Sequence, residues 1–185
     1  MSASDARGRA PRERALDEVC AVVFEPLYDD VVVPTRATEQ SAGYDLRAYL
    51  GGRPTLLAGT GGVTERAASR DGAGAMYVEV GAGQRAIVPL GFRARLPDGH
   101  EAQLRMRSSI AFRKGLTMPN APGTIDADYP DEWLVMLRND GDQPVRIDHG
   151  ERIAQVVIAR YTTATWTRGA VAMTTTRKGG VGSTG

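Results

Sequence analysis

Residues 120–132 carry the side chains best suited to chemistry, in the order Asn-Ala-Pro-Gly-Thr-Ile-Asp-Ala-Asp-Tyr-Pro-Asp-Glu. Asp126 and Asp128 place two carboxylates, and Tyr129 a flat aromatic ring, within four residues of each other. A carboxylate can accept a proton from a reacting water, and a ring can pack against a flat ligand. Acidic residues are also common in surface turns, so the surrounding chain must decide between these interpretations.

The same stretch predicts a β-hairpin that would position these groups. Pro122-Gly123 interrupts the chain, and Pro130-Asp131 suits the central positions of a type I turn because proline presets φ. Residues 133–137 then form an apolar run typical of a strand. We therefore expect the two carboxylates on one arm of a hairpin, just before its tip.

Three further motifs bring polar groups to expected strands or their ends. Residues 107–109, Arg-Ser-Ser, combine a guanidinium that can fork onto two phosphate oxygens with two hydroxyls. Asp45 lies between two apolar neighbours on an expected strand, so its side chain points to the opposite face from theirs. Gln155 interrupts an apolar run, and its amide needs a partner from core backbone or a ligand.

Short strands at close spacing predict an all-β fold, a barrel or jelly roll. Apolar or alternating runs occur at residues 19–24, 77–80, 84–89, 92–96, 101–106 and 161–167. Glycine-rich and Pro-Asp-Gly turns separate several of these runs, and no long amphipathic helix pattern is present.

The chain divides into one domain with two tails. Residues 1–18 predict a disordered N-terminal tail, residues 19–168 the β domain, and residues 169–185 a flexible C-terminal segment. The last nine residues, rich in glycine and hydroxyls and beginning Arg-Lys, suit a lid over phosphates. Residues 51–75 are rich in Gly, Ala and Thr without a period, which predicts a surface insertion.

Composition excludes several classes of function. Lys plus Arg number 23 and Asp plus Glu 22, so the near balance argues against nucleic acid or an anionic membrane as the main partner. The single cysteine, Cys20, cannot form an intramolecular disulfide or a cysteine-rich metal site. No apolar run reaches transmembrane length. We expect a cytoplasmic protein.

Five motifs together resemble the trimeric deoxyuridine triphosphatase (dUTPase) family. They are residues 42–48, 107–109, 123–129, 150–155 and 179–185. The resemblance implies a distorted jelly roll that assembles as a homotrimer with three shared active sites, each closed by a C-terminal tail. It also implies hydrolysis of dUTP to dUMP and pyrophosphate, with Mg²⁺ carried by the triphosphate. Such an activity keeps uracil out of DNA and supplies dUMP for thymidylate synthesis.

The resemblance assigns the nucleoside end of the site to the expected hairpin. Asp126 is implied to hold the attacking water and the deoxyribose 3′-OH. Tyr129 is implied to pack under the deoxyribose and to leave no room for a 2′-OH. The remaining nucleoside contacts are implied for Asn120, Gly123, Thr124, Ile125 and Leu134.

The phosphate end is assigned to the other motifs. Residues Arg107, Ser108 and Ser109 are implied to bind phosphates, and Gln155 to position the phosphate chain. Asp45 is implied to contact the metal through water. In the tail, Arg177, Ser183 and Thr184 are implied to close on the γ-phosphate, with Val181 over the base.

Two positions depart from the family pattern. Val181 stands where the family usually has a phenylalanine that stacks on uracil, and the stretch between Arg177 and Val181 is one residue shorter than usual. Asp131 replaces a usual glycine at the hairpin turn and adds a negative charge there.

Two alternatives belong to other classes of function. The related dCTP deaminases also carry Arg-Ser-Ser, but their chemistry needs a glutamate three residues before an asparagine; counting back from Asn139, this chain has Met136. Some proteins of this fold are regulators that bind other proteins, and residues 51–75 offer a surface for such a partner. A tolerated loop is the simpler interpretation of that segment.

The departure at Val181 generates a first prediction. Replacing Val181 with Phe restores a stacking ring, a contact of about 1 kcal/mol or somewhat more. Steady-state kinetics with dUTP should therefore give a lower KM or a higher kcat for V181F. Unchanged values of both would contradict this account of the tail.

Overall fold

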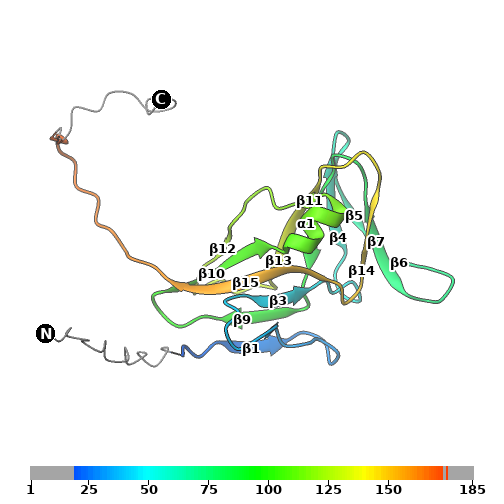
Figure 1. Cartoon of the computed structure of the whole chain (residues 1–185), viewed down its shortest axis with the longest axis horizontal. Coiled ribbons are helices and arrows are strands. Elements are labelled where there is room, and N and C mark those ends of the chain that lie inside the picture. The colour runs from blue at the N-terminus through cyan, green and yellow to red at the C-terminus, as the bar shows by residue number, and fades with distance from the viewer. Residues whose placement is uncertain (1–18, 173, 175–185) are drawn as a thin grey trace, which may run out of the picture.

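The structure, a computed structural model, describes residues 19–172 and residue 174 (Figure 1). Strands form almost all of this region, and its one helix, α1 (Ser108–Lys114), is short. The expected all-β fold is confirmed. Within the described residues, no helix has the length and apolarity needed to cross a membrane.

Two five-stranded sheets make up the body of the domain. The first has the order β12 (Gly123–Ile125), β10 (His100–Met106), β15 (Arg152–Arg160), β3 (Tyr44–Arg47), β2 (Thr35–Arg36). The second has the order β11 (Leu116–Thr117), β13 (Leu134–Asn139), β8 (Arg85–Pro89), β4 (Thr55–Gly59), β5 (Gly62–Arg66). Their buried residues belong to one hydrophobic cluster, as expected when two sheets pack face to face.

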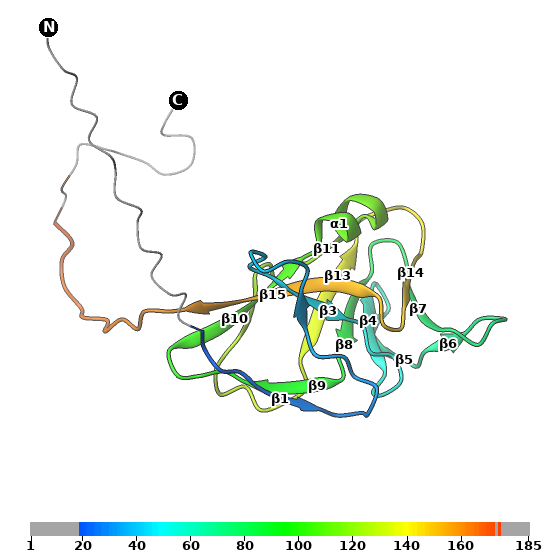
Figure 2. The same ribbon diagram turned by 60° about the horizontal axis from the view of Figure 1, so that its bottom comes forward.

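Smaller sheets extend this body at two places. One pairs β1 (Val23–Pro26) with β9 (Phe92–Arg95), and the other has the order β14 (Val145–Asp148), β7 (Met76–Val80), β6 (Ser69–Arg70). Figure 2 shows β1 and β9 side by side along one edge, with the β6–β7 hairpin projecting at the far end. The strands expected at residues 77–80, 84–89, 92–96 and 101–106 correspond to β7, β8, β9 and β10.

The strand β15 occupies a central place in the first sheet. It pairs antiparallel with β10 over seven residue pairs, from His100↔Arg160 to Met106↔Ala154, and with β3 on its other side. The pairing with β3 shifts register between Arg152 and Ala154, so Ile153 is an extra residue, as in a β-bulge. Ile153 and Ala154 are both fully buried, which breaks the alternation of an ordinary strand.

The expected β-hairpin at residues 120–137 is wrong as a pair of hydrogen-bonded strands. β12 pairs with β10, whereas β13 pairs with β8 and β11, so the two arms belong to different sheets. The hydrogen-bonded turn between the arms lies at residues 126–129, where Tyr129 N donates to the oxygen of Asp126 at 3.1 Å, and not at the expected Pro130-Asp131. Pairing to longer neighbours takes precedence over pairing between the arms.

The expected surface insertion at residues 51–75 is wrong for part of its length. β4 pairs with β8 in the second sheet, and Thr55 and Leu57 are buried. The segment then leaves the core, because every residue of the edge strand β5 is exposed. β4 was concealed because its sequence, Thr-Leu-Leu-Ala-Gly, does not alternate between apolar and polar residues.

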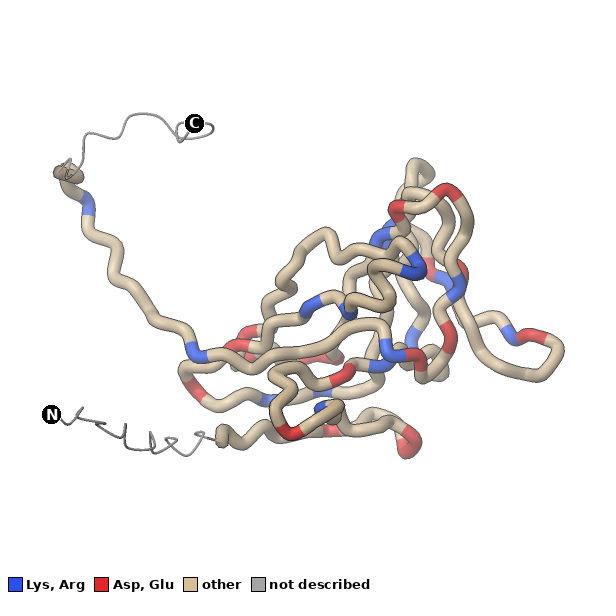
Figure 3. Tube along the Cα trace, viewed as in Figure 1, with Lys and Arg blue, Asp and Glu red and all other residues tan. Residues whose placement is uncertain are grey.

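The expected strand at residues 161–167 is also wrong. β15 ends at Arg160, and the chain continues as an arm without secondary structure through residue 172 (Figure 1). Tyr161 N still donates to the oxygen of Gly99 at 3.1 Å, but its side chain is 47% exposed and that of Trp166 95% exposed. Beyond Tyr161 the threonine-rich sequence pairs with no strand among the described residues. Figure 3 shows the arm leading away from the body. Between residues 161 and 172 its one charged residue is Arg168.

Burial of β4 generates a stability prediction. Leu57→Ala removes a side chain that is only 4% exposed, and such truncations cost about 2–5 kcal/mol. Val63→Ala on β5, where the side chain is 69% exposed, should change stability by less than about 0.5 kcal/mol. Urea unfolding at one fixed protein concentration measures both. Equal and small losses of unfolding free energy in the two variants would indicate that residues 55–59 lie in a surface loop and not in the core.

Candidate functional site

A cluster of polar side chains lies where β3, β10 and β15 meet the start of α1. The Nε of Arg107 lies 2.9 Å from Oδ1 of Asp45, and Nη1 of Arg152 donates to Oδ2 of the same carboxylate at 3.0 Å. Arg107 Nη1 also donates to the backbone oxygen of Arg152 at 3.1 Å. Three segments far apart in the sequence are thus joined through one carboxylate.

Gln155 belongs to the same cluster. It lies directly opposite Asp45 on β3 and opposite Arg105 on β10, so these side chains share one face of the sheet. Its Nε2 donates to the backbone oxygen of Met106 at 3.4 Å. A Cβ atom on Gly43 would collide with Gln155 Oε1, so glycine is required for the amide to lie in this position.

The helix α1 places the two predicted hydroxyls beside Arg107. Ser108 and Ser109 are its first residues and are exposed, while Ile110 packs into the core. The helix ends at Gly115, which has φ 62°, a left-handed conformation that glycine adopts readily. Lys114 anchors its last turn by an ion pair to Glu151, with Nζ 2.6 Å from Oε1.

A second group of predicted residues lies on β12 and the turn after it. Gly123 is packed closely, because a Cβ there would come within 3.2 Å of Asn120 Nδ2 and 3.3 Å of Leu104 Cβ. Asp126 is exposed, and its backbone oxygen accepts from Tyr129 N at 3.1 Å, which closes a tight turn.

The ring of Tyr129 lines a groove of about 450 Å³ between this turn and the β1–β9 pair. The tyrosine is half-buried, and its hydroxyl donates to the backbone oxygen of Glu132 at 3.4 Å. The other lining residues are Val23, Glu25, Arg93, Ala94, Arg95, Asp98, Ala127, Asp128 and Pro130.

Glu132 supports this turn from inside the protein. The residue is 4% exposed, its Oε1 accepts from Gly91 N at 2.7 Å, and Arg53 Nη1 lies 3.7 Å from its Oε2. Burial raises the pKa of this carboxyl, although the Gly91 amide and the Arg53 guanidinium act in the opposite direction. Next to it, Trp133 is buried, and its Nε1 has no hydrogen-bond partner among the described residues.

The two groups lie at opposite ends of β10. Ile125 pairs with Ala102, and Arg107 follows Ala102 by five residues, a separation of roughly 17 Å at the usual strand rise. Asp126 continues in the direction away from Arg107, because β12 is antiparallel to β10. Within one chain, the carboxylate of Asp126 and the Arg107 cluster therefore cannot meet at one reacting atom.

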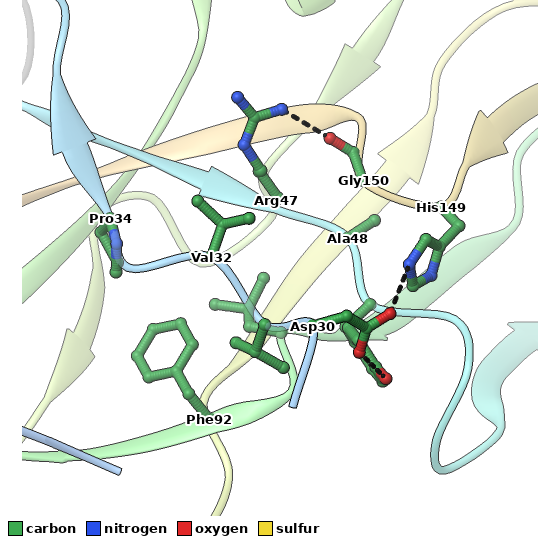
Figure 4. A pocket seen from close by; sticks show the side chains of 11 residues that line it. Asp30, Val32, Pro34, Arg47, Ala48, Phe92, His149 and Gly150 are labelled. Atoms are coloured by element: carbon green, nitrogen blue, oxygen red, sulfur yellow. Dashed lines mark hydrogen bonds and ion pairs between the residues drawn. The ribbon is translucent and has the colours of Figure 1, made fainter. Parts of the chain in front are cut away.

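A second pocket, with polar groups of its own, lies where the loop at residues 30–34, the end of β3, the start of β9 and the turn at residues 149–150 meet (Figure 4). Tyr49 Oη donates to Asp30 Oδ1 at 2.7 Å, and Leu50 N donates to His149 Nδ1 at 3.0 Å. Burial and the Asp30 carboxylate raise the pKa of Tyr49, so the phenol keeps its proton. Arg47 Nη1 donates to the oxygen of Gly150, which together with these contacts fixes the turn that leads into β15.

Known proteins resemble this chain in sequence and in fold. The dUTPase family profile matches residues 64–185. A deoxyuridine 5′-triphosphate nucleotidohydrolase of Rhizobium rhizogenes strain K84 is 44% identical over 144 residues, 77% of this chain and 86% of the relative. The chain belongs to the dUTPase family.

Solved structures of dUTPases have the same fold. The crystal structure of dUTPase from Streptococcus mutans matches with a TM-score of 0.59 and 26% identity, covering 77% of this chain and 98% of that one. A mutant dUTPase of phage phi11 of S. aureus, described for its coordination of a structural Mg(II) ion, matches with a TM-score of 0.62 and 16% identity. Their alignment covers 82% of this chain and 98% of the phage protein.

The structure brings some of the residues expected from the dUTPase resemblance together and separates others. Asp45, Arg107 and Gln155 form one cluster, with Ser108 and Ser109 beside it. The residues expected to contact the nucleoside are divided between the two sheets. Leu134 begins β13 in the second sheet, whereas the others lie on β12 of the first sheet or next to it: Asn120, Gly123, Thr124, Ile125, Asp126 and Tyr129. Arg177, Val181, Ser183 and Thr184 lie outside the described residues. All these roles stay predictions.

Two residues at these groups were missed from the sequence. Arg152 shares Asp45 with Arg107, and Glu132 supports the turn that carries Tyr129. For Arg152 a signal existed in the consecutive apolar residues Ile153 and Ala154, which mark the bulge. Glu132 gave no signal, because its acidic side chain at a turn predicts exposure.

The raised pKa of Glu132 generates a prediction on stability and pH. The folded protein holds this proton more tightly than the unfolded chain, so the unfolding free energy should fall as pH rises from the unfolded pKa through the raised folded pKa. Glu132→Gln keeps an acceptor for Gly91 N and removes this titration. In urea unfolding from pH 4.5 to pH 8, the unfolding free energy of the variant should increase relative to that of the wild type as pH rises.

The exposed Glu65 on β5 provides the matched control, because Glu65→Gln makes the same chemical change outside the core. A stability advantage of Glu132→Gln that did not grow with pH, or that Glu65→Gln matched, would show that burial of Glu132 is not the cause.

Proposed function

We propose that this protein hydrolyses dUTP to dUMP and pyrophosphate, in agreement with the name of its 44% identical relative, a deoxyuridine 5′-triphosphate nucleotidohydrolase. The observation that carries the proposal is the cluster of Asp45, Arg107 and Gln155, with Ser108 beside it. These groups come from three motifs that the dUTPase resemblance assigns to the phosphate end of the site, with Asp45 contacting the metal through water. They occur in a chain that belongs to the family.

In the proposed reaction Asp126 holds a water molecule and accepts its proton. The water oxygen bonds to the α-phosphorus while the bond from that phosphorus to the bridging oxygen breaks, so pyrophosphate leaves with the bonding electrons. The exposure of Asp126 at the end of β12 leaves its carboxylate accessible to substrate and water. Arg107, Ser108 and Ser109 hold phosphate oxygens, and the guanidinium offsets their charge.

Selection of the nucleoside is assigned to the segment around β12. The half-buried ring of Tyr129 packs under the deoxyribose and excludes a 2′-OH. Asn120 and the backbone of Gly123–Ile125 read the uracil edge, which a site of paired amides does more strictly than an apolar pocket. The tight approach of Asn120 to Gly123 supports this assignment, because it fixes the amide beside the backbone that it assists.

Mg²⁺ is the expected cofactor, and the described residues fit it only as an ion carried by the substrate. No group of three or more acidic or His/Cys side chains among them forms a metal cage. Asp45 has one arginine on each oxygen, which leaves further lone pairs to accept from metal-bound water. When bound, Mg²⁺ neutralises charge on the phosphate oxygens.

A homotrimer with shared sites accounts for the separation along β10. A base and the groups that bind phosphate must lie within hydrogen-bond reach of one substrate. In one chain Asp126 and Arg107 are roughly 17 Å apart or more, so the proposal requires Asp126 of one copy to face the Arg107 cluster of another. The exposed arm at residues 161–172 is consistent with further contacts between copies.

Deamination of dCTP is less well supported. Met136, at the position that needs a glutamate, is half-buried on β13 and pairs with Ile87. The nearby buried carboxylate, Glu132, is held by Gly91 N and Arg53 and is not placed to move a proton to a ring amine.

The decisive measurement is pyrophosphate release from dUTP, dCTP, dTTP and UTP in the presence of magnesium. We expect rapid release from dUTP, and release at least about 100-fold slower from the others because the site binds uracil and excludes a 2′-OH. Asp126→Asn should lower kcat with dUTP by about 10²–10⁴-fold, the usual contribution of a general base.

Asp128→Asn is the control, since it removes an exposed carboxylate from the same turn. It should stay within a few-fold of the wild type. Equal losses in the two variants would indicate that Asp126 acts only through local charge, and ammonia release from dCTP would favour the deaminase alternative.

A further inference from the structure

Arg53 belongs to the segment at residues 51–75, yet it reaches a buried carboxylate next to the turn at residues 126–129. Its Nη1 lies 3.7 Å from Oε2 of Glu132. The side chain of Glu132 is 5% exposed, whereas that of Arg53 is 41% exposed. The contact differs from an ordinary surface ion pair, because one of its two charges is withdrawn from water.

Close packing on both sides fixes the backbone of Arg53. A Cβ atom on Gly52 would collide with the ring of Tyr28, so only glycine lets the chain pass there without displacing that ring. On the other side, Pro54 restricts the residue before it to extended conformations. Thr55, which begins β4, is 2% exposed. Arg53 is therefore held between a packed glycine and a buried strand.

Glu132 connects Arg53 to the turn that carries Tyr129. Its Oε1 accepts from Gly91 N at 2.7 Å, and its backbone oxygen accepts from Tyr129 Oη at 3.4 Å. The next residue, Trp133, donates from its N to the oxygen of Phe92 at 2.9 Å. The side chain of Glu132 thus joins the turn to the loop between β8 and β9, while its backbone contacts the tyrosine.

The charge of Arg53 matters to Glu132 because the carboxylate is buried. Burial raises the pKa of Glu132, and the amide of Gly91 and the guanidinium of Arg53 act against this rise. Without Arg53 the carboxylate would keep a single amide donor in the interior. It would then take up a proton or move toward water, and either change alters the contacts that hold the turn.

We infer that Arg53 is a positioning residue for nucleoside selection, which holds the turn at residues 126–129 through Glu132 and so fixes the ring of Tyr129. This inference rests on the proposed function and deepens it. Since Tyr129 is proposed to exclude a 2′-OH, a displaced ring would distinguish less strictly between dUTP and UTP. The segment at residues 51–75 would then serve the site of its own chain.

The ratio of kcat/KM for dUTP to kcat/KM for UTP tests the inference, measured as pyrophosphate release with magnesium and enough enzyme to quantify the slower substrate. Arg53→Ala should lower this ratio by about tenfold, because a small displacement of a positioning group weakens discrimination. A purely structural role would reduce the amount of folded enzyme and leave the ratio unchanged, which would overturn the inference.

Two further variants at the same position separate charge from packing. Arg53→Met keeps the aliphatic stem and should lower the ratio as Arg53→Ala does. Arg53→Lys keeps a positive charge and should restore part of the ratio. An unchanged ratio in Arg53→Met would assign the effect to packing and would overturn the inference.

Arg66→Ala is the matched control, because Arg66 is an exposed arginine of the same segment on the edge strand β5. It removes the same charge from the segment and should leave the ratio within about twofold of the wild type. An equal fall in Arg53→Ala and Arg66→Ala would show that the contact with Glu132 is not the cause.

A double-mutant cycle tests the route through Glu132. Glu132→Gln keeps an acceptor for Gly91 N and removes the charge that Arg53 faces. In this background Arg53→Ala should change the ratio by less than about twofold. A full further loss would show that Arg53 acts by another route. A wild type that releases no pyrophosphate from dUTP would instead reject the proposed function, so the two failures are distinguishable.

Discussion

The antiparallel pairing of β15 with β10 and β3 is the constraint on which the site depends. Seven consecutive pairs with β10 fix the register on one side, and one extra residue changes it on the other. A slip of one residue exchanges the faces of a strand. With this register Asp45 on β3 and Gln155 on β15 lie together with Arg107, which follows β10, and Arg152, which begins β15. The buried Ile153 and Ala154 hold that arrangement against slippage.

The residue proposed as the base and those proposed to bind phosphate lie at opposite ends of a single strand. β10 leads from the turn near Asp126 to Arg107, and its stiffness keeps these groups apart in each copy. In the proposed homotrimer a complete site would form only between copies. Assembly and activity would then be coupled, because the surfaces that bring copies together would also bring Asp126 to the Arg107 cluster.

The sequence allowed the fold class to be predicted, but not the pairing of all its strands. Strands such as β8 and β10 were predicted correctly because the alternation of apolar and polar residues indicates which side chains face the core. The supposed hairpin failed because local turn chemistry does not reveal which longer strand competes for each arm. β4 was concealed in a small-residue segment, and residues 161–167 have strand propensity without a partner strand in the described part of the chain.

The same limit applies to the site. Asp45, Arg107 and Gln155 were identified through family motifs, and the structure places them together. Arg152 was missed because the face of the sheet on which it lies depends on a bulge. The extra residue moves every side chain on one side of it to the opposite face, and a bulge has only a faint sequence signature. Glu132 was missed because the burial of an acid depends on tertiary neighbours, here Gly91 and Arg53.

The contrasting positions of the two tryptophans give the protein a pair of internal optical reporters. Trp133 is 2% exposed behind the turn that carries Tyr129, whereas Trp166 is 95% exposed on the arm. Indole emission shifts to the blue in apolar surroundings, and only an exposed ring is quenched by aqueous iodide. The fluorescence of the unlabelled protein thus contains separable signals from Trp133 in the interior and Trp166 on the arm. Docking of the arm on another copy would shift the emission of Trp166 to the blue and protect it from iodide.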